Sequence, residues 1–459
     1  MKSFPAFRFT LGLILTAAAW GCTSSGGGDD PPKAGAGGSS QGGGGSGGGG
    51  GRPAEGGSGG SAAGGASGGS AGAQAGSGGA SAGAGGAMAG AGGQGGATDA
   101  AAPDAPPSNA AASKLIKLDT TAAGASVMGD VPKFPVAILL DETTFDFTKA
   151  KPKGEDIRFS TAEGAPLPHE IELWDATAKK AALWVKVDVT GNSTQMIKMT
   201  WGDPAAMDAS DGKAVFDTKD GFMGVWHLSE PGSNEDGAYK DSTANEGHAK
   251  GVRMTPEGTG PGRVGNAILL DGSMNQWAEV AVEKSRMEGS APNNMTYSIW
   301  FNAKSHTFEY QCMFAKGERD FRLHYFGKAE YYGNRHLTES CLESTAGNDV
   351  CPVNRGPTAT DCKLGSWYHI LAVHDYPRTR FYVNGKLDAE LTNNGTWTAD
   401  NQASVTIGTN PTSGQRNNRS FDGLLDEARL MLVTKDEHWI KLEYESQREG
   451  QKFSSFAAE

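Results

Sequence analysis

Short runs in which apolar and polar positions alternate recur along the second half of the chain. Between Ala182 and Asp188, for example, Leu183, Val185 and Val187 alternate with other side chains. Alternate residues of a strand face the same side of a sheet, so this pattern predicts a strand with one buried face. Similar runs occupy residues 134–140, 156–160, 169–174 and 195–201. Together they predict a small antiparallel β-sandwich over residues 115–213.

The same kind of pattern continues from residue 214 to residue 450. Short apolar runs there are bounded by glycine, asparagine and aspartate, as in sandwiches. Asn384-Gly385 is the dipeptide that type I′ hairpin turns prefer. These features predict a second antiparallel sandwich, so the fold class is all-β.

One helix interrupts the β pattern near the end of the chain. Thr434 and Glu437 have the spacing of a capping box, which predicts a helix over residues 435–448. The apolar face of this helix would consist of Trp439, Ile440 and Tyr444. We expect it to pack on the sandwich that precedes it.

The first residues have the pattern of an export signal. Lys2 and Arg8 precede an apolar run that is too short to span a bilayer. This run ends in Ala19-Trp-Gly-Cys22, which resembles the lipobox of bacterial lipoproteins. The resemblance implies a signal peptide over residues 1–21 and acylation of Cys22, and Thr23 in place of aspartate implies the outer membrane, on its periplasmic or extracellular face. The alternative is an ordinary secretory signal followed by an incidental cysteine.

Residues 22–114 consist mainly of glycine, serine and alanine. Such a segment buries too little apolar surface to offset its ordering entropy, which predicts a disordered tether. A flexible chain of about 90 residues has a root-mean-square reach of roughly 50 Å. We therefore expect the sandwiches to be held away from the membrane.

The net charge of -12 belongs to the folded part, because the charges of the first 100 residues cancel. An acidic module argues against nucleic acid as a partner. It suits neutral polymers, cations or protein partners.

The remaining cysteines are four in number and lie close together in the second sandwich. An even number in an exported protein predicts two disulfides. We favour Cys341–Cys351 and Cys312–Cys362 among the three possible pairings. A zinc site is the alternative, although the CxxC spacing typical of such sites is missing.

The motifs of the first sandwich occur in a characteristic order: Gly154-Glu-Asp-Ile-Arg-Phe159, Leu167-Pro-His-Glu-Ile-Glu-Leu-Trp174 and Met199-Thr-Trp-Gly202. In this order they resemble a bacterial domain of unknown function. That family recurs in surface proteins, sometimes beside ExbB/TolQ-type transport proteins, and often directly before a LamG-like domain. The resemblance implies no activity.

Motifs in residues 214–450 resemble a LamG-like domain of the concanavalin A-like lectin/glucanase superfamily. They include Gly265-Asn-Ala-Ile-Leu-Leu-Asp-Gly272, Met295-Thr-Tyr-Ser-Ile-Trp-Phe301 and Phe421-Asp-Gly-Leu-Leu-Asp-Glu-Ala-Arg-Leu430. The resemblance implies a jelly-roll sandwich.

Catalysis needs a separate test, because the superfamily includes glycoside hydrolases and lyases. A retaining hydrolase of this type uses a Glu-x-Asp-x-Glu strand, which the chain lacks. The closest acidic cluster contains Asp426 and Glu427, which as neighbours on a strand would face opposite sides. We therefore predict no catalytic residues.

Calcium is the cofactor that the LamG resemblance implies. Its candidate ligands are Glu230, Asp241 and Asp426, since hard oxygen ligands suit this ion. The alternative is that the two aspartates organise turns.

Exposed aromatic side chains could stack on sugar rings. Tyr310, Tyr331 and Tyr332 are the candidates in the second sandwich, and Trp174 and Trp184 in the first. The alternative for all five is packing within the fold.

These features predict a non-catalytic cell-surface lipoprotein that presents a lectin-like sandwich for carbohydrate binding or adhesion, with a glycan or a surface protein as ligand. A second hypothesis is a structural or accessory subunit of an envelope or biopolymer-transport assembly. A third is a polysaccharide-active enzyme.

Overall fold

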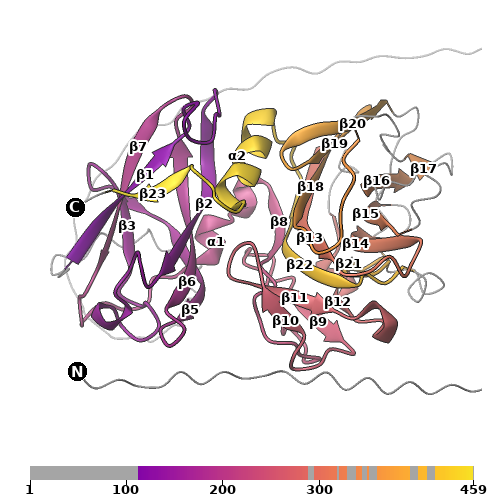
Figure 1. Cartoon of the computed structure of the whole chain (residues 1–459), viewed down its shortest axis with the longest axis horizontal. Helices are drawn as coiled ribbons and strands as arrows, with labels where there is room; N and C mark the ends of the chain where they lie inside the picture. The colour runs from indigo at the N-terminus through magenta and orange to yellow at the C-terminus, as the bar shows by residue number, and fades with distance from the viewer. Residues whose placement is uncertain are drawn as a thin grey trace, which may run out of the picture. The chain divides into compact units, whose positions relative to one another are not determined.

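The computed structural model describes residues 112–287, 294–317, 320–327, 338–343, 349–350, 359–392, 402–410 and 419–457 (Figure 1). The predicted signal peptide, Cys22 and nearly all of the tether lie outside these residues, as do Tyr331 and Tyr332. In this described part, no helix has the length and apolar character needed to cross a membrane.

The first domain is a sandwich of two antiparallel sheets, as the alternating pattern predicted. One sheet has the order β23-β1-β7-β3-β4 and the other β2-β6-β5. The strands are β1 (Ala112–Asp119), β2 (Val131–Asp141), β3 (Arg158–Thr161), β4 (Pro166–Leu167), β5 (His169–Asp175), β6 (Lys180–Val189), β7 (Thr194–Trp201) and β23 (Ser454–Phe456). A single-turn helix, α1 (Gly212–Val215), follows this sandwich.

The second domain is a larger sandwich. One sheet has the order β10-β11-β22-β13-β18-β19-β20, with β8 also paired to β22, and the other β17-β16-β15-β14-β21-β12-β9. The strands of the first sheet are β8 (Phe222–Trp226), β10 (Thr259–Pro261), β11 (Asn266–Leu270), β13 (Asn294–Ala303), β18 (Tyr368–Asp375), β19 (Arg378–Val383), β20 (Lys386–Thr392) and β22 (Gly423–Met431). Those of the second are β9 (Ala249–Val252), β12 (Trp277–Val280), β14 (Tyr310–Lys316), β15 (Phe321–Phe326), β16 (Thr338–Glu343), β17 (Asp349–Val350) and β21 (Val405–Ile407).

The predicted hairpin at Asn384-Gly385 connects β19 and β20. Both residues have a positive φ, 51° and 71° respectively. Positive φ at both central positions is what a type I′ turn requires. The dipeptide therefore identified this turn correctly.

The C-terminal helix α2 (Glu437–Gln447) begins later than the capping box predicted. Its N-cap is Asp436, whose carboxylate accepts a hydrogen bond from the Trp439 amide at 2.8 Å. An aspartate can cap a helix with its own side chain, so the helix does not need Thr434. The predicted start at residue 435 was wrong by two residues.

Helix α2 packs between the two sandwiches rather than on one of them (Figure 1). Trp439 contacts Phe134 of β2 edge-on, with 5.8 Å between ring centroids. One hydrophobic cluster joins this helix to both domains, and it includes Leu371 of β18 and Met431 of β22. After the helix, β23 returns to the first domain and pairs with β1. The first domain is thus completed by the end of the chain.

The predicted disulfide between Cys312 and Cys362 is absent from the structure. Both residues are buried and carry thiols. Cys362 packs in the hydrophobic cluster between the two sheets of the second domain, a cluster to which Cys312 does not belong. The other predicted pair, Cys341–Cys351, falls outside the residues whose side chains are described.

Candidate functional site

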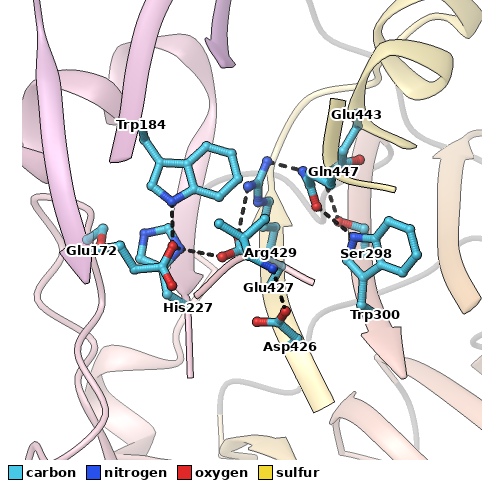
Figure 2. A network of polar contacts seen from close by, with 12 residues as sticks. Glu172, Trp184, His227, Ser298, Trp300, Asp426, Glu427, Arg429, Glu443 and Gln447 are labelled. Carbon is cyan, nitrogen blue, oxygen red and sulfur yellow. Dashed lines mark hydrogen bonds and ion pairs between the residues drawn. The ribbon is translucent and has the colours of Figure 1, made fainter. Parts of the chain in front are cut away.

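A buried polar network lies where the first domain, the second domain and α2 meet (Figure 2). Strand β5 contributes acidic side chains, β22 contributes a carboxylate and a guanidinium, and the segment after β8 contributes a histidine. We call these residues the interdomain network: Glu170, Glu172, Trp184, His227, Ser229, Glu427, Arg429 and Glu443.

His227 lies at the centre of this network. Its Nδ1 is 2.7 Å from Glu427 Oε1, and its Nε2 is 3.4 Å from Glu170 Oε2. The ring also stacks on the Trp184 indole, with an interplanar angle of 18°. The imidazole therefore joins a strand of each domain, β5 and β22, through its two nitrogens.

Glu172 is held by donors from both domains. Trp184 of β6 donates its indole N–H to Glu172 Oε2 at 2.8 Å, and the Ser229 hydroxyl donates to Oε1 at 2.5 Å. Burial, the largest influence, raises the pKa of Glu172 to about 8. The side chain is thus expected to be protonated at neutral pH.

Arg429 supplies the permanent positive charge of the network. Its guanidinium donates to Glu427 Oε2 at 2.7 Å and to Glu443 Oε1 on α2 at 3.3 Å. It also lies over the Trp184 ring, 4.5 Å from the centroid. This one side chain, completely shielded from solvent, therefore contacts both domains and the helix.

The ionisation of the network follows from these contacts. Burial alone would lower the pKa of His227, but the surrounding carboxylates of Glu427, Glu172 and Glu170 raise it well above its ordinary value. Burial alone would raise the pKa of Glu427, but His227 and Arg429 lower it. Burial raises the pKa of Glu443 to about 7. The arrangement favours a charged His227–Glu427–Arg429 group beside protonated Glu172.

Glu172, His227 and Glu427 are also close enough to suggest a metal site, since their ligand atoms lie within 4.8 Å of one another. Every carboxylate oxygen of Glu172 and Glu427 nevertheless has a donor from the protein at 2.5–2.8 Å. A metal ion would displace one of these donors and would lie beside the Arg429 guanidinium, which carries the same sign of charge. We therefore interpret the cluster as a hydrogen-bonded network.

The three candidate calcium ligands are not brought together. In the part of the chain that the structure describes, Glu230, Asp241 and Asp426 do not form a group of metal-ligating atoms. Asp241 instead accepts hydrogen bonds from the amides of Val225, Thr243 and Gly247, at 2.8–3.0 Å.

Glu230 and Asp426 hold backbone segments in the same way. Glu230 accepts from the Lys240 amide at 2.8 Å. Asp426 accepts from the amides of Arg263 and Val264, at 2.6 and 3.1 Å. These contacts support the alternative that the aspartates organise turns.

The candidate sugar-stacking residues that are described all take part in packing. Trp184 is fully buried, and its role in the interdomain network accounts for it. Trp174 contacts Phe145 and Phe147 edge-on. Tyr310 is half-buried against Phe326, with 5.1 Å between ring centroids.

The sequence reasoning missed His227, Glu172 and Arg429 as a group. Arg429 and Glu427 lie in a strand whose other residues are mostly buried, and such polar positions in a buried strand are a detectable signal. Their partners His227 and Trp184 lie 200 or more positions earlier in the chain, as in the His227–Glu427 contact with a separation of 200. The sequence alone does not show how the two domains pack, so it does not indicate that these residues form one group.

Two family models match the chain. Residues 153–229 match the Domain of unknown function (DUF2341), and residues 272–441 match the Concanavalin A-like lectin/glucanases superfamily. No curated protein matches the sequence.

Several solved structures align with about half of the chain at low identity. Domain 4 of AbnA, an extracellular arabinanase from Geobacillus stearothermophilus solved with arabinotriose, is 18% identical, with a TM-score of 0.36 over 50% of this chain and 98% of the other. The binding domain of Paraclostridial Mosquitocidal Protein 1 is 14% identical, with a TM-score of 0.37 over 50% and 53%. A pentraxin from Limulus polyphemus is 19% identical, with a TM-score of 0.27 over 37% and 81%.

The order of the two family matches agrees with the order of the sequence motifs, and the described strands of both matched segments pair in antiparallel sheets. The chain contains a DUF2341 domain followed by a domain of the concanavalin A-like lectin/glucanase superfamily.

Proposed function

We propose that this protein is a non-catalytic carbohydrate-binding protein of the cell surface, anchored to the outer membrane through acylated Cys22. The lectin-type sandwich supports the carbohydrate-binding part. The lipobox-like segment and the glycine-rich tether support the anchor and the display of the folded domains at a distance from the membrane.

The observation that carries the non-catalytic part is the state of the clustered carboxylates. A glycosidase needs two carboxylates that flank a bound glycosidic bond. The side chains of Glu172, Glu427 and Glu443 are only 1–2% exposed, and they bridge the domains and α2 instead of lining an open cleft. Their role is to fix the lectin sandwich against its neighbour.

A glycan array with the full chain tests carbohydrate binding, with and without added calcium. Binding of a defined set of glycans is the expected result, and uniformly blank arrays in both conditions would refute it. Loss of binding on chelation, with recovery on adding calcium, would in addition support the calcium prediction.

Catalysis and anchoring need separate measurements. Release of reducing ends from a panel of polysaccharides, abolished by Glu427→Gln but not by the exposed Glu257→Gln, would overturn the non-catalytic proposal. For the anchor, Cys22→Ser should move the protein from the membrane fraction to the soluble fraction. Unchanged fractionation would contradict lipid attachment at this residue.

A further inference from the structure

A groove of about 620 Å³ lies next to the interdomain network and is lined by both domains and the end of α2. Its volume falls within the range of about 300–1,000 Å³ that is typical of small-molecule sites. The residues that line it include the apolar Leu139 of β2 and Phe456 of β23. They also include Arg263, from the turn between β10 and β11, and Gln447, from the last turn of α2.

Arg263 is held in place from two sides. Asp426 Oδ2 accepts the backbone amides of Arg263 and Val264, at 2.6 and 3.1 Å, which fixes the turn. A Cβ on Gly262 would lie 2.7 Å from the same oxygen, so this turn requires glycine. The guanidinium lies over the Trp300 ring, 5.6 Å from its centroid. The cation is therefore positioned before any ligand arrives.

Gln447 presents a donor whose orientation follows from its neighbour. Its Oε1 accepts the Trp300 indole N–H at 2.6 Å. Because an indole N–H can only donate, the oxygen of the amide must face Trp300, and the NH₂ group must face elsewhere. Among the described residues this buried Nε2 has no hydrogen-bond acceptor, although the side chain is only 2% exposed overall. A buried donor without an acceptor is destabilising, and a ligand oxygen would satisfy it.

The Glu449 carboxylate makes one long contact with Arg263 in the groove. Glu449 Oε2 is 3.4 Å from Arg263 Nη1, yet the Glu449 side chain is 90% exposed. The Arg263 side chain is 12% exposed, and its Nε has no acceptor in the described part of the chain. An arginine can bind a carboxylate through two parallel hydrogen bonds, a geometry that this single long contact does not use. An external carboxylate can therefore replace Glu449 at low cost.

We propose that this groove binds the carboxylate-bearing unit of an acidic saccharide, with Arg263 and Gln447 donating to its oxygens. The apolar side chains of Leu139 and Phe456 suit the C–H face of a sugar ring, and Ser454 and Ser455 line the same groove. This assignment rests on the proposed carbohydrate-binding function and specifies the ligand class and the site.

Calorimetric titration of the full chain tests the assignment, with trigalacturonate as the probe and its methyl ester as the neutral match. We expect trigalacturonate to bind and the ester to bind at least about tenfold more weakly, since a hydrogen bond to a charged group contributes about 1.5–3 kcal/mol. Arg263→Gln should reduce affinity for trigalacturonate by about tenfold or more. The exposed Arg253→Gln, remote from the groove, is the matched control and should leave affinity unchanged.

A second variant, Glu449→Gln, should change the affinity for trigalacturonate in the opposite direction and leave folding intact, because the side chain is exposed. It removes the competing carboxylate, so trigalacturonate should bind more tightly, by about two- to fivefold. Equal binding of acid and ester, no change in either groove variant, or equal competition by an acidic peptide would each overturn the assignment. Binding of neutral glycans together with no binding of trigalacturonate would overturn the groove assignment while leaving the proposed function intact.

Discussion

Replacement of Arg429 by methionine should destabilise the folded domains by about 3 kcal/mol. Arg429 donates to Glu427 at 2.7 Å and to Glu443 at 3.3 Å, and its guanidinium stacks on Trp184. Loss of one partner of a buried ion pair typically costs about 3–5 kcal/mol, because the other charge remains buried without compensation.

The individual contacts lead to the same magnitude. The short bond to Glu427 contributes about 2–3 kcal/mol, the longer bond to Glu443 about 1, and the desolvated cation–π contact about 2. The methionine side chain recovers about 2 kcal/mol by burying apolar surface in the same space. His227 stays beside Glu427 at 2.7 Å and limits the loss, which places the expected cost near the lower end of the range.

Urea denaturation of the full chain, followed by tryptophan fluorescence, measures this cost. Trp184 belongs to the network, and Trp300 donates to Gln447 of α2 beside it, so their emission reports the loss of the network (Figure 2). The matched control is Arg378→Met, since Arg378 is 52% exposed and lies 3.7 Å from Asp375. Exposed pairs of this kind contribute about 0–1 kcal/mol.

A double variant tests whether Arg429 and Glu427 act as a pair. Arg429→Met with Glu427→Gln should cost at least about 1 kcal/mol less than the two single changes added together, because the double variant leaves neither member of this ion pair buried without its partner. If Arg429→Met costs no more than Arg378→Met, or if the single changes are additive, the network does not stabilise the interface as argued. A changed slope with denaturant would instead indicate that the domains unfold separately.

Three further predictions concern ionisation, helix capping and the cysteines. Because burial raises the pKa of Glu172 to about 8 from 4.5, the folded state retains a proton that the unfolded state releases, so the free energy of unfolding should fall as pH rises between these values. Burial lowers the pKa of His369 to about 3 from 6.5, so this residue makes the free energy of unfolding rise with pH below pH 6.5. The fall caused by Glu172 should therefore be clearest between about pH 6.5 and 8, and it should be smaller in Glu172→Gln. Asp436→Ala should cost about 1 kcal/mol in urea denaturation through loss of the α2 cap, whereas the exposed Glu437→Ala should cost less. Mass spectrometry after alkylation should find Cys362 unlabelled in the native protein and labelled after unfolding, because it is buried and burial raises the pKa of its thiol; recovery of Cys362 in a disulfide would contradict the structure.

Local patterns predicted the elements of the fold well, because they depend on neighbouring residues. The alternation in residues 182–187 identified β6, and Asn384-Gly385 identified a turn whose positive φ values few other dipeptides accept. The capping box was misplaced because Asp436, two residues beyond Thr434, also has an oxygen that can accept the first free amides.

The candidate site was harder to predict, because its chemistry depends on contacts between distant segments. Residue type alone makes Asp426 a candidate calcium ligand, yet its carboxylate accepts hydrogen bonds from the amides of the turn that carries Arg263, 163 positions earlier. His227 and Glu172 were not considered together, although the structure places a His227 nitrogen 3.6 Å from a Glu172 oxygen. Motifs indicate which residues are present, but only packing decides whether an acidic side chain faces solvent or another domain.

The network and the groove are both held by side chains of strand β22. Strand β22 carries Asp426, which positions Arg263, directly before Glu427, which holds His227 at the domain interface. The apolar side chains that line the groove belong to the first domain, whereas Arg263 belongs to the second. Any loosening of the interface should therefore separate the two halves of the groove.

His227→Gln tests this connection without touching the groove. The variant removes the charge that links Glu170 to Glu427, while Gln can still donate one hydrogen bond. We expect affinity for trigalacturonate to fall at least about threefold in a protein that remains folded by tryptophan fluorescence. Lys250→Gln removes a charge from a side chain that is 53% exposed; it is the control and should have no effect. If His227→Gln lowers stability but binds trigalacturonate as the unaltered protein does, the groove does not depend on the docking of the two domains, and the carboxylate network serves stability alone.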